Sequence, residues 1–91
     1  MNQDLFTDRD ELYRGVYLER HAPQSNLHRA YALRIARSLF GHWGLSRFWG
    51  RSGTRGRSKT EWFDTAAKAE RALEAKLAEK RRRGYELRNQ R

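Results

Sequence analysis

The sequence predicts an α+β fold, in which an antiparallel sheet of about four to five strands forms a meander and carries one long C-terminal helix. Short stretches of alternating apolar and polar residues succeed one another up to residue 63, with connections too short for crossover helices. After residue 64 the apolar period changes to that of an amphipathic helix. The 91 residues suffice for one modest core, and therefore for one domain.

The alternation of apolar and polar side chains places each strand in turn. Residues 1–14 show no period and are expected to form a flexible leader, so the domain is predicted to occupy residues 15–91. The segment at residues 21–26, which contains the only proline, is expected to be a loop. The glycine-rich segment at residues 50–56 is expected to be a turn. The predicted strands cover residues 15–20, 31–36, 43–49 and 58–63.

The segment after Asp64 carries signals for both ends of a helix. Asp64-Thr65 offers an N-cap, and Gly84 is the glycine that commonly follows the last helical residue. The basic run 80–83 complements the helix dipole, so it has a structural explanation and we assign it no nucleic-acid role. Residues 85–87 are expected to return the chain to the core. The apolar stripe of the helix consists of Ala66, Ala69, Leu73 and Leu77.

The net charge of +9 belongs entirely to the central segment of the chain. No acidic residue lies between Glu19 and Glu61, whereas the rest of the chain has eleven basic and eleven acidic residues. Arginine dominates, and its planar guanidinium group suits phosphate contacts. The charge favours an acidic partner, above all nucleic acid, over the alternative of a merely solvated surface. The nine basic residues are Arg20, Arg29, Arg34, Arg37, Arg47, Arg51, Arg55, Arg57 and Lys59.

The residues that commonly perform catalysis or bind metals are sparse. There is no cysteine, and His21, His28 and His42 lack the helical spacing of a zinc site. We therefore predict no catalytic residue, no metal site and no cofactor. The polar, acidic N-terminus does not resemble a signal peptide, and no apolar run reaches membrane length. These features predict a cytoplasmic protein, with the nucleoid as one expected location.

The stretch RFWGRSGTRGRSK, residues 47–59, combines glycines with cations. Gly50, Gly53 and Gly56 do not form a nucleotide-binding loop, which would need a helix directly after it. We interpret them as hairpin glycines that supply positive φ angles. Strand alternation puts Trp49 on the same face as Arg47, and leaves two roles for it open: a core residue, or an exposed ring that stacks on nucleic acid.

Four motifs occur in a characteristic order: NLHRAYAL at residues 26–33, LFGHW at 39–43, WGRSGTRG at 49–56, and RGY at 83–85 after an alanine-rich helix. With these motifs, residues 18–87 resemble the WGR domain, and in particular its small stand-alone bacterial members. The resemblance implies an antiparallel sheet with one helix. Ala30 departs from the aromatic residue common at this position in relatives.

In poly(ADP-ribose) polymerases the WGR domain contacts DNA near a break and relays that contact to neighbouring domains. The resemblance therefore implies that Trp49 packs on the sugar–phosphate at a strand end. It places Arg51 at the same DNA and interdomain surface. No polymerase domain accompanies these residues here, so any signal would pass through a separate partner protein.

The leading hypothesis is a non-catalytic module that contacts the DNA backbone near ends or nicks. The alternative is an adaptor that binds a protein partner through the same basic face. A third hypothesis, an enzyme, requires Glu19, Glu61 or a histidine to fold against that face. The predicted nucleic-acid-binding residues are Trp49, Gly50, Arg51, Arg47, Arg55, Arg57 and Lys59.

Overall fold

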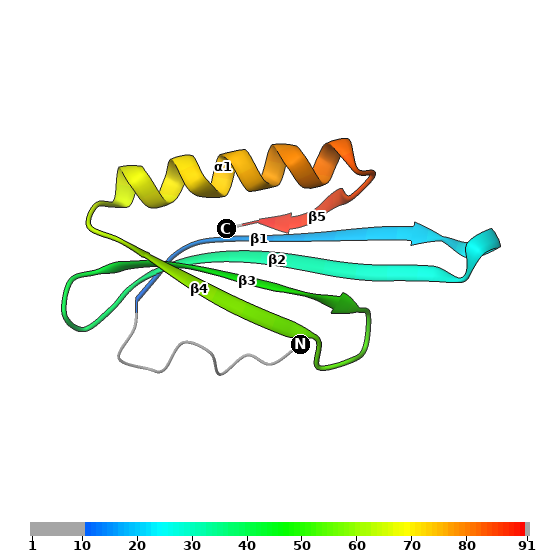
Figure 1. Ribbon diagram of the computed structural model, residues 1–91, viewed down its shortest axis with the longest axis horizontal. Helices are drawn as coiled ribbons and strands as arrows, with labels where there is room; N and C mark the ends of the chain where they lie inside the picture. The colour runs from blue at the N-terminus through cyan, green and yellow to red at the C-terminus, as the bar shows by residue number, and fades with distance from the viewer. Residues whose placement is uncertain (1–10, 91) are drawn as a thin grey trace.

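A computed structural model describes residues 11–90 of the chain as one antiparallel five-stranded sheet with one α-helix packed against it (Figure 1). The predicted α+β architecture is confirmed. The elements are β1 (Glu11–Ala22), the 3₁₀ turn η1 (Pro23–Ser25), β2 (Leu27–Arg37), β3 (Trp43–Arg51), β4 (Arg57–Phe63), α1 (Ala66–Arg82) and β5 (Glu86–Gln90).

The strands lie in the order β4-β3-β2-β1-β5. The first four follow one another as the predicted meander, because each connection is a tight hairpin. The helix α1 then runs back across one face of the sheet, and β5 pairs with β1 at the edge opposite β4 (Figure 1). Because α1 covers only part of one face of the sheet, the uncovered part of that face is available for functional side chains (Figure 1).

The first strand begins earlier than the sequence indicated. It starts at Glu11, so residues 11–14 belong to the sheet and the predicted flexible leader is wrong for them. The register between β1 and β2 shifts between Leu12 and Arg14, which interrupts the alternation of side chains there. This bulge explains why periodicity alone did not reveal the strand. The remaining part of the predicted leader, residues 1–10, lies outside the described residues.

The hairpin between β1 and β2 is longer than predicted. β1 continues to Ala22, so the expected loop at residues 21–26 shrinks to η1 and Asn26, and β2 begins at Leu27, four residues before the predicted strand. Asn26 is left-handed, with φ 51°, and its N–H donates to the Pro23 carbonyl at 3.0 Å. The Arg20–Arg29 and His21–His28 pairs near the turn are polar, and this part of the hairpin projects beyond the end of α1 (Figure 1). Polar strand ends do not show the apolar alternation that marks a strand in sequence.

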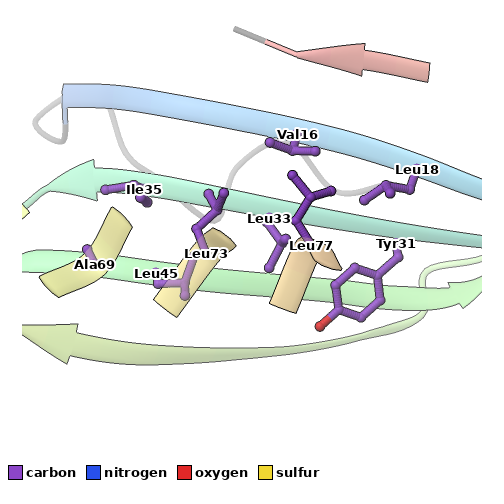
Figure 2. Packing of buried hydrophobic residues seen from close by; sticks show 9 residues of the cluster. All are labelled: Val16, Leu18, Tyr31, Leu33, Ile35, Leu45, Ala69, Leu73 and Leu77. Carbon is purple, nitrogen blue, oxygen red and sulfur yellow. The ribbon is translucent and has the colours of Figure 1, made fainter. Parts of the chain in front are cut away.

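The hydrophobic core lies between α1 and the covered face of the sheet (Figure 2). Leu73 sits at its centre, fully buried against residues of the three central strands. Small alanines on the inner stripe allow close contact between helix and sheet, as the sequence predicted. The cluster consists of Val16, Leu18, Tyr31, Leu33, Ile35, Leu45, Ala69, Leu73 and Leu77.

Both ends of α1 are capped by the residues that the sequence indicated. The Thr65 hydroxyl accepts a hydrogen bond from the Lys68 backbone N–H at 3.1 Å. Gly84 adopts φ +93°, and its N–H donates to the Arg81 carbonyl at 3.0 Å. Within residues 11–90, no helix is long and apolar enough to cross a membrane.

Candidate nucleic-acid interface

The turn between β3 and β4 brings two segments of backbone into close contact. Gly50, Gly53 and Gly56 have φ angles of +155°, +84° and +70°. A Cβ atom on Gly50 would lie 2.8 Å from the Gly56 Cα, and one on Gly56 would lie 2.5 Å from the Trp49 carbonyl oxygen. The turn leads directly into β4 and not into a helix. The interpretation as hairpin glycines is therefore confirmed, and the turn lacks the helix N-terminus of a nucleotide loop.

Trp49 combines parts of both roles that the sequence left open. Its ring is partly buried and packs against the edge of the core on the face that carries α1. It lies directly across from Tyr31 in β2, and the Arg47 guanidinium carbon is 5.8 Å from its ring centroid. A ring held in this way is fixed in orientation and still presents a surface, with a cation beside it.

Most of the predicted cations gather around Trp49. Arg57 is its cross-strand partner in β4, and Lys59 is the partner of Arg47, so all four side chains share one face of the sheet. Arg51 ends β3 and is exposed. Arg55 lies in the turn itself, between the end of β3 and the start of β4, and has no register partner in the sheet.

The outer part of the turn lines a small cavity of about 40 Å³ on the face away from α1. Its walls include Tyr17, Ala30 and Phe48 on that face, and also Trp49 and Arg51. Arg55 lines this cavity together with Trp49 and Arg51, so it lies beside the turn residues of the predicted site.

Lys80 and Tyr85 lie next to the buried Tyr31, the cross-strand partner of Trp49. The Lys80 ammonium lies 4.6 Å from the ring centroid of Tyr31 and 5.8 Å from that of Tyr85. Burial lowers the pKa of Lys80, and the nearby charge of Arg83 adds to this effect. The basic end of α1 therefore contributes to the same region. Lys80 follows Leu77 by one helical turn on the inner stripe, and this spacing is the signal that identifies it.

The family model of the WGR domain matches residues 14–91. The chain belongs to the WGR domain family. It is 41% identical over 70 residues to an uncharacterized protein, y4dW, of Sinorhizobium fredii (strain NBRC 101917 / NGR234). That match covers 77% of this chain and 34% of the relative, so the chain spans about a third of the length of the protein it matches. WGR domains are known in nucleic-acid-binding contexts.

The cations around residues 49–56, which we call the WGR turn, have no acidic partner within the described part of the chain. The ion pairs between residues 11 and 90 occur elsewhere. Arg14 pairs with Glu70 at 3.2 Å and Glu74 at 2.6 Å, which ties β1 to α1. The charge around Trp49 is therefore uncompensated by these residues, and an electropositive surface of this kind attracts polyanions.

The acidic and histidine residues that an enzyme would need do not meet at the WGR turn. Glu19 lies 3.5 Å from His28, and its other contacts are with Tyr17 and Arg88, on the face away from α1. Glu61 pairs with the core residue Leu45 and follows Lys59 by two residues, so it lies on the same face as the cations, but it is exposed and has no ion pair with residues 13–90. Across the same residues, no cluster of three or more potential metal ligands of the His, Cys, Asp or Glu type occurs.

Proposed function

We propose that this WGR domain is a non-catalytic module that binds nucleic acid, with DNA as its main partner, by contacting the sugar–phosphate backbone near ends or nicks. The observation that carries the proposal is the partly exposed ring of Trp49, framed by Arg47, Arg51 and Arg57, none of which has an acidic partner among residues 11–90.

The two kinds of side chain have complementary tasks. A flat, oriented tryptophan ring can pack on a sugar or a terminal base, and a base stacked on an aromatic ring contributes about 1–3 kcal/mol. The guanidinium groups then take the flanking phosphates, which position the nucleic acid without reading its sequence. A strand end suits this arrangement because the ring can reach a sugar or base that is not covered by a further nucleotide.

The proposal predicts DNA binding that depends steeply on salt and on the state of the strand end. Fluorescence anisotropy would be measured across a salt series with four DNA probes of the same sequence. They are a closed circular duplex, a blunt-ended duplex, a nicked duplex and a 5′-dephosphorylated duplex. We expect a log–log slope of about −0.9 for each phosphate that is neutralised. Nicked or blunt duplexes are expected to bind more tightly than a closed circle of the same sequence. If no duplex binds even at low salt, the proposal is wrong.

Substitutions assign the binding to the WGR turn. Arg51→Ala and Trp49→Ala are each expected to weaken binding about tenfold, corresponding to roughly 1.4 kcal/mol. Arg37→Ala is the matched control, because Arg37 is also exposed but lies at the other end of the sheet. Circular dichroism of Trp49→Ala verifies that the variant is folded. Equal binding by Arg51→Ala and wild type would show that the interface lies elsewhere.

A further inference from the structure

Three arginines form a single row across the sheet. Arg20 of β1 is the register partner of Arg29 in β2, and Arg29 is the partner of Arg51 in β3. All three side chains are exposed. Directly paired residues share a face, and Arg29 precedes the core residue Tyr31 by two positions, so this arginine row lies on the face that carries α1.

The arginine row is unfavourable for the isolated domain. Side chains directly opposite each other on antiparallel strands have Cβ atoms roughly 4.5–5.5 Å apart, and like charges at that distance destabilise the sheet. No ion pair with residues 13–90 compensates any of the three. The register therefore places three positive charges side by side with no neighbouring negative charge paired to them. β-Branched residues at these positions would stabilise the strands.

The row is continuous with the surface around Trp49. Arg51 lies two residues beyond Trp49 on the same strand, and Arg29 and Arg51 together line a depression of about 100 Å³ beside residues 26–28, near the turn of the β1–β2 hairpin. A Cβ atom on Gly84 would lie 3.5 Å from the Arg20 Nε, so the side chain of Arg20 reaches the end of α1. The row thus connects the hairpin, the WGR turn and the basic helix end.

We propose that the arginine row is a second phosphate-binding part of the interface, which carries the nucleic acid from the strand end at Trp49 onto the β1–β2 hairpin. Three strands spaced about 4.8 Å apart give the row a length of about 10 Å, which matches the axial length of about three nucleotide steps of one DNA strand at a rise of about 3.4 Å per step. Bound phosphates relieve the repulsion, so the row lowers the stability of the free domain and raises its affinity. This inference rests on the proposed function.

The test measures stability and binding on the same variants. Arg29→Gln removes the central charge and retains a long polar side chain. We expect its thermal midpoint at low salt to exceed that of wild type, with the difference disappearing as salt screens the repulsion. We also expect its affinity for a nicked duplex to fall about threefold to tenfold, and its salt slope to become shallower by about 0.9.

Two further variants make each outcome decisive. Arg37→Gln lies on the same strand at the opposite end of the sheet, and is expected to leave the salt slope unchanged. Arg20→Gln is expected to reproduce the effects of Arg29→Gln. If Arg51→Ala loses affinity while Arg20→Gln and Arg29→Gln keep the wild-type slope, the inference is wrong and the proposed function stands. If Arg29→Gln loses both stability and affinity, Arg29 has a structural role, and this result would also overturn the inference.

Discussion

Tyr31 illustrates how tightly the core and the candidate interface are joined. Its side chain is buried at the edge of the hydrophobic cluster (Figure 2), directly across from Trp49. Its hydroxyl has no hydrogen-bond partner among the described residues, and Lys80 lies over its ring. Burial raises the pKa of the Tyr31 hydroxyl, and the nearby Arg47 guanidinium opposes this shift.

Replacement of Tyr31 by phenylalanine tests the cost of that hydroxyl. A buried polar group without a partner destabilises a protein, so Tyr31→Phe is expected to be neutral or up to about 1 kcal/mol more stable at pH 7. Because the folded pKa is raised, the protonated hydroxyl favours the folded state, and this contribution is lost as the pH rises through the folded pKa. Wild type should therefore lose more stability than Tyr31→Phe above about pH 10.

Urea unfolding of both proteins between pH 7 and pH 11 measures this difference. Tyr17, whose pKa is also raised by burial, is present in both proteins and cancels in the comparison. A variant that is less stable than wild type by more than about 1 kcal/mol at pH 7 would indicate that the hydroxyl makes a favourable hydrogen bond.

The WGR turn makes distinct demands on its glycines. Gly56 approaches the Trp49 carbonyl so closely that an added Cβ atom forces the backbone to move, whereas a Cβ atom on Gly53 meets nothing within 4 Å. Both residues have positive φ, so alanine costs roughly 1–2 kcal/mol at either position. Gly56→Ala should destabilise the domain by clearly more than this amount, because it also displaces the strand that holds Trp49.

Gly53→Ala is the matched control for Gly56→Ala. Chemical denaturation gives the two free energies of unfolding, and the affinity for a nicked duplex shows whether the turn has moved. We expect Gly53→Ala to bind nearly as well as wild type and Gly56→Ala to bind more weakly. Equal effects of the two substitutions would contradict the close approach of the backbones.

The elements were predictable from sequence to different extents. The helix and its caps were predicted almost to the residue, because Thr65 and Gly84 are local signals and the apolar stripe has a clear period. The ends of β1 and β2 were not, because the bulge after Leu12 and the polar pairs near the hairpin interrupt the alternation. Periodicity detects a strand only where one of its faces is buried.

Residues of the candidate interface that are distant in sequence could not be grouped from the sequence alone. Trp49 and its neighbours on β3 and β4 were found because they are adjacent in sequence or joined by a short turn. Arg20 and Arg29 were counted among the basic residues but could not be joined to Arg51. Their row depends on the register of three strands, which the hairpin and its turn determine.

The molecule as a whole has two unlike ends. It measures 46 × 24 × 19 Å, and the β1–β2 hairpin, the WGR turn and the end of α1 lie at one end of its long axis (Figure 1). Exposed apolar side chains lie toward the other end, on the β2–β3 turn and on β4, where Leu39, Phe40 and Trp62 are 62%, 85% and 59% exposed. The cations around Trp49, the arginine row and the basic run 80–83 thus lie toward the end of the molecule where α1 ends and the sheet extends beyond the helix (Figure 1).

The three tryptophans lie in different surroundings and report directly on this arrangement. Trp49 lies at the basic end, Trp43 packs beside Tyr13 with ring centroids 5.1 Å apart, and Trp62 covers Gly44 on the face away from α1. Each indole N–H gives one peak in a ¹⁵N–¹H spectrum. Titration with a nicked duplex should shift the Trp49 peak and leave those of Trp43 and Trp62 in place. A shift of Trp62 with Trp49 unchanged would contradict the proposal that nucleic acid binds at the WGR turn.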